Sequence, residues 1–218
     1  MVGKVITVAQ QKGGSGKTTV AAHLAVALSR LNGTTVALLD VDPQGSLGEW
    51  FEARERRLGE RHTGMGFRTA SGWGARREAM SLSRDYDIVV VDTPPKSDLE
   101  AKPAIEAASL VVVPIQPTPV DFWSSAATLK IVTREAVPAL VVLNRVPPKG
   151  RVTDAMIDAI LGLDADVAAA RIGNRVAFAE CMGEGSTVIE AAAGSKGAEE
   201  VYAFAREISQ RLTARLAA

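Results

Sequence analysis

Two lysines and a run of glycines near the start of the chain have the spacing of a phosphate-binding loop. The stretch Lys12-Gly13-Gly14-Ser15-Gly16-Lys17-Thr18-Thr19 follows an apolar run, Val5–Ala9, and precedes Val20–Leu31, whose apolar positions share one helical face. When a glycine-rich loop joins a strand to a helix in this way, its backbone N–H groups can surround a polyphosphate. We therefore expect Lys17 to neutralise the β- and γ-phosphates of a nucleotide and the Thr18 hydroxyl to bind Mg²⁺.

This loop departs from the ordinary pattern G-x-x-x-x-G-K-[ST], because the first glycine of that pattern would fall on Gln11. The stretch instead reads K-G-G-x-G-K-T and adds a second lysine, Lys12, at its start. The spacing alone makes Lys12 a second cation near the phosphates.

Three aspartates follow two expected strands, where carboxylates can serve a magnesium ion. Asp40 and Asp42 follow Thr35–Leu39, and alternate residues of a strand point to the same side. An aspartate before proline and glycine is also common in polar turns, which is the alternative for this pair. Asp92 ends the apolar run Ile88–Val91, where an aspartate of a nucleotide-binding fold holds Mg²⁺ directly or through water. The expected magnesium ligands are Thr18, Asp40, Asp42 and Asp92.

Short apolar runs alternate with helical stretches, the pattern of an open, mostly parallel twisted sheet with helices on both faces. The expected strands are Val5–Ala9, Thr35–Leu39, Phe67–Thr69, Ile88–Val91, Leu110–Val113 and Ala139–Leu143, with an edge strand near Arg171–Ile172. Residues 44–84 fit this pattern poorly beyond a helix at Leu47–Leu58, and residues 144–154, with two prolines and a glycine, are expected to form a loop. Both segments are expected at the carboxyl edge of the sheet, where ligands of open α/β folds bind.

Composition narrows the class of protein. The 218 residues, 47% of them hydrophobic, are enough for one domain, 1–218, with a sizeable core. Lys and Arg number 25 and Asp and Glu number 25, so any nucleic-acid contact is expected to be a local basic patch. The single cysteine, Cys181, excludes an internal disulfide and favours a reducing compartment. Without a secretory signal or a run of 18 apolar residues, the expected location is the cytoplasm.

The loop and the carboxylates together resemble those of the deviant Walker A ATPases, a P-loop NTPase group that includes ParA-type partition proteins, MinD, nitrogenase iron protein and ArsA-type pumps. The resemblance implies ATP and Mg²⁺ as ligands and a homodimer that encloses ATP, in which the signature lysine, here Lys12, reaches the phosphates of the partner subunit. It also implies that Asp42 orients the attacking water, that Asp40 supports the magnesium shell, and that Thr93-Pro94-Pro95 belongs to the second switch loop. The implied catalytic residues are Lys12, Lys17 and Asp42, and the implied nucleotide-binding residues are Gly13, Gly14, Ser15, Gly16, Lys17, Thr18, Thr19 and Asn144. For Asn144, contact with the adenine ring and capping of the strand end are equal alternatives.

Three further stretches resemble the small partition ATPases typified by ParF, which lack an N-terminal helix-turn-helix domain. They are Pro114–Phe122, Ile172–Phe178, and Gly185–Glu190 with Lys196–Glu200. Residues 46–84 are the part of the chain that the resemblance does not cover. The resemblance implies an ATP-dependent dimer that binds DNA nonspecifically, associates with the nucleoid in its ATP state, and is released by a ParB-like or cargo-adaptor protein.

Nonspecific DNA binding needs lysine and arginine contacts to phosphates. The candidates are Arg145, Lys149, Arg151, Arg171 and Arg175, for which ordinary solvated surface charge is the alternative.

A membrane-associated regulator of the MinD kind is the alternative function. The segment Glu199–Leu216 has an apolar stripe with arginines on the other side, which fits either a membrane-surface helix or an ordinary last helix packed on the sheet. An iron–sulfur or metal-transport accessory would need soft cysteine ligands, so a single cysteine excludes an iron–sulfur cluster.

Overall fold

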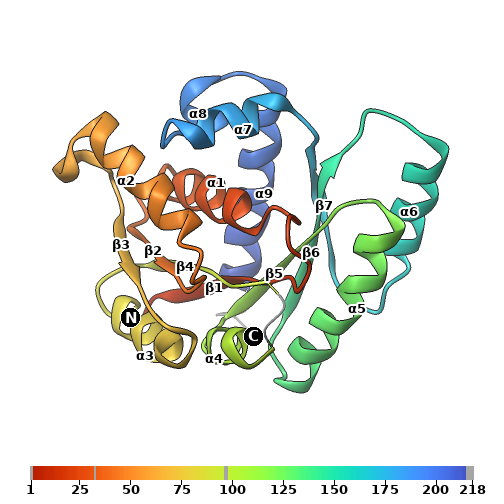
Figure 1. Cartoon of the computed structure of the whole chain (residues 1–218), viewed down its shortest axis with the longest axis horizontal. Helices are drawn as coiled ribbons and strands as arrows, with labels where there is room; N and C mark the ends of the chain where they lie inside the picture. Colours follow the sequence, from red (N-terminus) through yellow and green to blue (C-terminus); the bar gives the residue numbers. More distant parts are fainter. Residues whose placement is uncertain (1, 32, 96–97, 215–218) are drawn as a thin grey trace.

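A computed structural model describes residues 2–31, 33–95 and 98–214, although the side chains of residues 98 and 99 are not described. Its centre is a seven-stranded sheet in the order β3-β2-β4-β1-β5-β6-β7, and every neighbouring pair of strands is parallel (Figure 1). The strands are β1 (Lys4–Val8), β2 (Val36–Asp40), β3 (Gly66–Thr69), β4 (Ile88–Asp92), β5 (Leu110–Ile115), β6 (Ala139–Val146) and β7 (Val167–Gly173). The predicted open parallel α/β sheet is confirmed.

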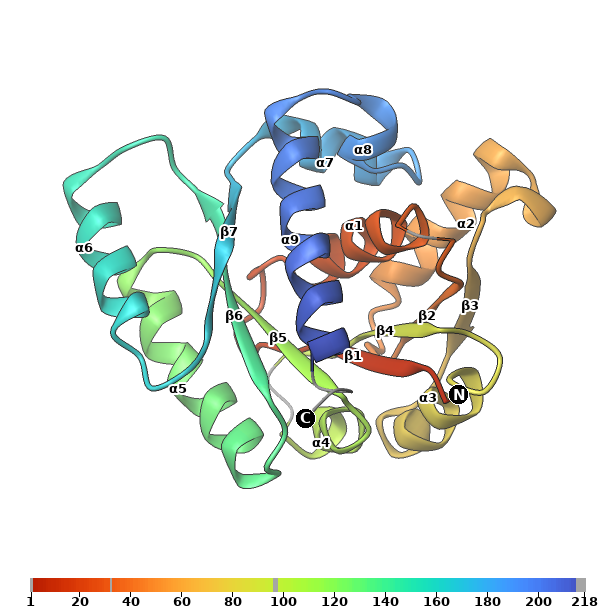
Figure 2. The ribbon, with the colours of Figure 1, turned by 180° about the vertical axis from the view of Figure 1, so that it is seen from behind.

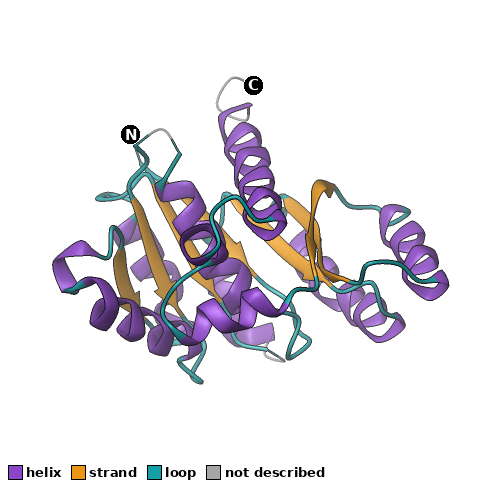
Figure 3. Cartoon of the chain, turned by 90° about the horizontal axis from the view of Figure 1, so that it is seen from above, coloured by secondary structure: helices purple, strands orange, loops and turns teal. Residues whose placement is uncertain are grey.

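Helices cover both faces of this sheet, as the views from behind and from above show (Figures 2 and 3). One face carries α1 (Lys17–Ser29), α2 (Ser46–Leu58), α7 (Val176–Gly183), α8 (Val188–Ala191) and α9 (Lys196–Ala214). The other face carries α3 (Ala75–Leu82), α4 (Asp98–Glu106), α5 (Pro119–Arg134) and α6 (Arg151–Leu161). Two short 3-10 helices, η1 (Glu60–His62) and η2 (Gly72–Gly74), lie in the segment between α2 and α3. Burial on both faces explains why β2, β4 and β5 are apolar at nearly every position.

The structure corrects the two segments that fitted the sequence pattern poorly. Residues 144–146 continue β6, because Val146 still pairs with Gly173 of β7, and α6 already begins at Arg151. The predicted loop 144–154 is therefore confined to the few residues between these elements. Residues 44–84 hold α3 and both 3-10 helices besides the expected α2 and β3.

The last helix lies on the sheet with its apolar face inward. Val201, Phe204, Ala205, Ile208 and Leu212 are all buried in the core against α1 and β7, whereas Leu216 lies outside the described residues. This placement favours an ordinary packed helix over a membrane-surface helix. In the described part of the chain, no helix is long and apolar enough to cross a bilayer.

Candidate nucleotide-binding site

The glycine-rich loop joins β1 to α1 at the carboxyl edge of the sheet and leads directly into the first turn of the helix. Gly16 caps α1 with a φ of 91°, a conformation that glycine adopts without steric strain. A Cβ atom at this position would lie 2.4 Å from the Asn144 side-chain nitrogen, so the close approach also requires glycine.

Three side chains from distant strands hold the carbonyl groups of the loop. Gln116, which follows β5, donates to the Gly14 carbonyl at 2.9 Å, and Arg145 donates to the same oxygen at 3.1 Å. Asn144 donates to the Ser15 carbonyl at 2.8 Å and is itself buried. These donors hold the carbonyl groups of the loop in place. Of the three, Gln116 was missed in the sequence because it has no motif of its own.

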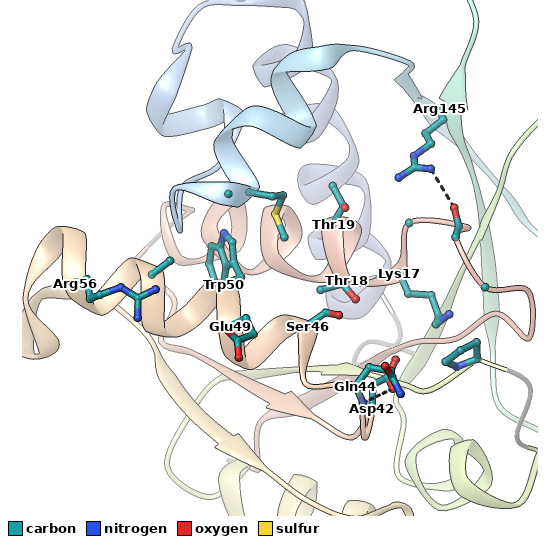
Figure 4. Close-up of a pocket in the computed structure, with 17 residues that line it drawn as sticks. Lys17, Thr18, Thr19, Asp42, Gln44, Ser46, Glu49, Trp50, Arg56 and Arg145 are labelled. Carbon is teal, nitrogen blue, oxygen red and sulfur yellow. Dashed lines mark hydrogen bonds between the residues drawn. The ribbon is translucent and has the colours of Figure 1, made fainter.

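A cavity of 640 Å³ opens over the loop and contains most of the predicted ligand residues (Figure 4). Its lining comprises Gly13, Gly14, Gly16, Lys17, Thr18, Thr19, Asp42, Gln44, Ser46, Glu49, Trp50, Ala53, Arg56, Pro95, Arg145, Met182 and Gly183. A second cavity of 300 Å³ adjoins it, shares Thr19, Arg145 and Met182, and is bounded by apolar side chains such as Ile172 and Phe178. The site therefore offers a polar space over the loop and a more apolar space beside it.

Lys17 lines the cavity, and the buried Asp92 lies behind the lining, close enough for the two charges to interact. Burial lowers the pKa of the Lys17 ammonium, while the charges of Asp92 and Asp42 act in the opposite direction. Burial raises the pKa of Asp92 to about 7, although the hydrogen bond from the Thr18 hydroxyl, at 2.6 Å, favours its ionised form. One oxygen of Asp92, Oδ1, is buried and has no hydrogen-bond partner in the described structure.

The side chains of Thr18 and Asp92 fit a magnesium site whose remaining ligands would be phosphate oxygens. An unpartnered carboxylate oxygen beside a threonine hydroxyl supplies the hard oxygen donors that Mg²⁺ prefers, and such sites use few protein ligands. No group of three or more acidic, histidine or cysteine side chains gathers into a metal cluster among the described residues. The protein therefore offers a partial ligand shell. When bound, Mg²⁺ would neutralise negative charge on the phosphates.

The other two predicted magnesium residues have different surroundings. Asp42 lines the larger cavity, and one of its oxygens accepts the Gln44 N–H at 3.0 Å. Asp40 is buried, and its two oxygens accept the N–H groups of Asp42 at 3.0 Å and of Gly48 at 2.9 Å. Asp40 thus organises the turn that carries Asp42 into the cavity and the start of α2.

Lys12 forms an ion pair with Asp121 in the first turn of α5. The Asp121 carboxylate is buried, and the same oxygen accepts the Thr118 hydroxyl at 2.6 Å. About a third of the Lys12 side chain stays exposed, at 31%. Nothing in the sequence pattern marked Asp121 as its partner, because the two residues are 109 positions apart.

The five predicted DNA contacts do not form one group. The structure places Arg145 at the phosphate-binding loop, and Arg175 forms an ion pair with Glu200 at 2.6 Å. Lys149, Arg151 and Arg171 are exposed and make no ion pair within the part of the chain that the structure describes. DNA binding by these five residues stays a prediction, and the structure adds that the Arg145 guanidinium also holds the Gly14 carbonyl of the nucleotide loop.

A glycine-rich loop between β1 and α1, a buried lysine, and a threonine–aspartate pair at the sheet edge define a P-loop nucleotide-binding protein. The CobQ/CobB/MinD/ParA nucleotide binding domain family matches residues 6–188, and the chain belongs to this family. It is a ParA/MinD-type ATPase of the ParA partition family.

Relatives of known role cover almost the whole chain. Maintenance of carboxysome distribution protein A of Halothiobacillus neapolitanus is 28% identical over 211 residues, which cover 93% of this chain and 95% of that protein. Chromosome partitioning protein ParA of Myxococcus xanthus is 26% identical over 258 residues, with 97% and 90% covered.

Solved structures share the fold. The ATP complex of McdA from Cyanothece has a TM-score of 0.76 at 19% identity and covers 94% of this chain and 95% of its own. The cell division ATPase MinD of Pyrococcus furiosus has a TM-score of 0.80 at 22% identity, with 95% and 99% covered. At this level of identity the likeness shows the fold alone.

Proposed function

We propose that this protein is an ATP-switched positioning ATPase: ATP closes a homodimer, the dimer binds DNA nonspecifically, and a cargo-bound adaptor stimulates hydrolysis and releases it. The observation that carries the proposal is the second lysine of the loop, Lys12. Its ammonium pairs with the buried Asp121 carboxylate, and 31% of its side chain is exposed to solvent. The exposed part leaves this second cation accessible to the phosphates of another subunit.

Within one subunit, the two cavities divide the nucleotide between them. The phosphates occupy the larger cavity against Lys17 and the loop amides, with Thr18 and Asp92 toward Mg²⁺. The base occupies the smaller cavity, whose apolar walls suit a stacked ring. Asn144 closes the boundary between them by holding the Ser15 carbonyl.

Asp42 is the residue that we assign to the attacking water. It lines the phosphate cavity and is fixed through the backbone by Asp40, so its carboxylate is positioned without being buried. Phosphoryl transfer asks the protein mainly for placement and charge stabilisation. One positioned carboxylate with Lys17 and the partner's lysine supplies both, and hydrolysis stays slow until an adaptor completes the site.

The cargo class follows from the relatives as a proposal. The carboxysome-distribution and chromosome-partitioning proteins that match this chain support a role in distributing a protein assembly, a plasmid or a chromosome. DNA binding would rest on Lys149, Arg151 and Arg171 near the β6–β7 end of the sheet. Reversing Lys149 and Arg171 to glutamate should weaken binding to duplex DNA and reduce its salt dependence by ~1 log–log unit per lost contact.

The test of the dimer is a Lys12→Gln variant with its matched double variant. Lys12→Gln alone leaves the Asp121 carboxylate buried and unpaired, so Lys12→Gln with Asp121→Asn removes both charges and guards against misfolding. With a nonhydrolysable ATP analogue, both variants should bind nucleotide near normally and dimerise at least about tenfold more weakly by light scattering. Lys196→Gln, a surface lysine of α9, is the control. An unchanged monomer–dimer midpoint in the double variant would refute the proposal.

A further inference from the structure

The turn that leads into α3 displays the most exposed large apolar side chain among the described residues. Trp73, in η2 just before α3, is 82% exposed, and Met80, two turns later, is 41% exposed. Arg76 and Arg77 of α3 and Arg84, just beyond its end, are exposed as well, and within α3 the repeat of about 3.6 residues brings Arg76, Arg77 and Met80 to the side opposite its buried residues. We call this surface the α3 ridge, defined as Trp73, Arg76, Arg77, Met80 and Arg84.

The opposite face of α3 shows that the ridge is an outer surface of a firmly packed helix. Ala75, Ala79 and Leu82 are buried between α3 and the sheet, so the orientation of α3 is fixed and Met80 stays on the outer side. In Figure 1 and Figure 2, α3 lies beside α4 on the same face of the sheet. The ridge is thus presented by the fold itself.

Two of the three ridge arginines carry a charge that no carboxylate of the described chain pairs. Arg56, Arg134 and Arg175 each pair with a carboxylate of this chain. Within the described structure, Arg77 and Arg84 are exposed and form no ion pair. A binding partner could therefore form ion pairs with these two guanidinium groups and apolar contacts with the exposed side chains beside them.

We propose that the α3 ridge is a docking surface for a protein partner whose contact segment is acidic and apolar. Tryptophan, methionine and arginine are the residue types enriched where proteins meet, and the first and last of these are frequent hot spots. Carboxylates of the partner pair with Arg77 and Arg84, and its apolar side chains cover Trp73 and Met80. Duplex DNA would satisfy the arginines through its phosphates but has no comparable use for the exposed Met80.

The elements that carry the ridge pack on α4, the next helix after Asp92. At Gly72, a Cβ atom would lie 2.8 Å from the Glu100 Cα, so η2 is packed directly on α4. Arg76 also pairs with Glu106 of α4 at 3.6 Å. Since α4 is the next helix after the strand that ends at Asp92, a partner on the ridge would contact elements that pack on this helix. If the proposed function holds, this partner is the cargo adaptor.

The test measures binding without ATP, so its outcome is independent of hydrolysis and dimerisation. Overlapping synthetic peptides from the proteins encoded beside this chain's gene are probed with the labelled full chain, and each hit is titrated by fluorescence anisotropy. The hits should be acidic and apolar, and Trp73→Ala or the pair Arg77→Glu and Arg84→Glu should weaken them at least about tenfold. Two controls, Trp123→Ala, an indole 69% exposed on α5, and Arg61→Glu, an exposed arginine of η1, should leave the affinity within about twofold.

Several results would overturn the proposal. An array without hits, hits that are basic, or hits whose affinity the ridge variants do not change would each refute it. Short duplex DNA and vesicles of phosphatidylglycerol with phosphatidylethanolamine are titrated in parallel. A loss of DNA or vesicle binding in the ridge variants would assign the surface to that ligand instead, and a change in concentration-dependent light scattering would assign it to a second copy of the chain.

Discussion

The buried histidine of α1 should make the stability of this protein depend steeply on pH. His23 is 1% exposed, accepts the Val188 N–H on Nε2 at 3.1 Å, and donates from Nδ1 to the Thr19 carbonyl at 2.8 Å. The Val188 N–H points at the nitrogen that a second proton would occupy, so the ring is held in one neutral tautomer. Burial lowers the pKa of His23 from 6.5 to about 4.

The sign and size of the effect follow from this shift. Below about pH 6.5 the unfolded chain binds a proton on His23 that the folded chain refuses, so stability is complete above that pH and is lost as the pH falls toward 4. Integrating this difference gives a loss of about 2 kcal/mol between about pH 7.5 and about pH 5. Protonation of His23 would weaken the contacts of α1 with α7 and α8.

The measurement compares the native chain with His23→Gln, which keeps polar atoms in the site but does not titrate. Urea unfolding followed by circular dichroism at several pH values gives the free energy of unfolding of each protein. The carboxylates titrate in both proteins, so their contribution cancels in the comparison. The amount by which the free energy of unfolding of the native chain exceeds that of His23→Gln should therefore shrink by about 2 kcal/mol over this range. A difference that stays constant with pH would show that His23 is not the group responsible.

Three further substitutions test the site and the core. Lys17→Ala should weaken ATP–Mg²⁺ binding at least about a hundredfold by isothermal titration, because the phosphate charge loses its buried counter-ion; near-native affinity would argue against the assigned loop. Asp42→Ala should keep nucleotide affinity but lower phosphate release at least about tenfold, since only water placement is lost; a native rate would transfer that role to another residue. Glu190→Gln should reduce the free energy of unfolding by about 3 kcal/mol because it leaves the buried Arg54 guanidinium uncompensated, whereas exposed Glu199→Gln should change it by less than about 0.5 kcal/mol; equal effects would contradict the ion-pair argument.

The parts of the fold that the sequence predicted are those with a local signal. Parallel strands buried on both faces must be apolar at successive positions, so β2, β4 and β5 can be recognised from their residues alone. The glycine-rich loop is equally local, because its glycines, lysine and threonine all act within one turn. In contrast, β7 has few large apolar residues, so the sequence predicted only an edge strand near Arg171–Ile172, and the pairing with β6 extends this strand to Val167–Gly173.

The segment between α2 and β4 was hard to interpret for a related reason. Its strand β3 has only four residues and is stabilised by register with β2, from Ala37 opposite Gly66 to Asp40 opposite Thr69. Its helix α3 has a polar, arginine-rich outer face and only three residues buried inward. Short elements of this kind take their conformation from the sheet they pack on, and a few residues are too short a stretch for their periodicity to be recognised from the sequence.

The identity of the cations at the site could be predicted, but their partners could not. Lys12 was recognised as a second positive charge, yet its ammonium is held by Asp121 from an element far along the chain. Arg145 was predicted as a DNA contact. The continuation of β6 places its guanidinium within hydrogen-bond distance of the Gly14 carbonyl. A motif specifies which charges a loop needs, whereas tertiary packing decides which charges remain free. For the proposed DNA binding, we therefore expect the main contacts from residues such as Lys149 and Arg171, which are exposed and make no ion pair within the described part of the chain.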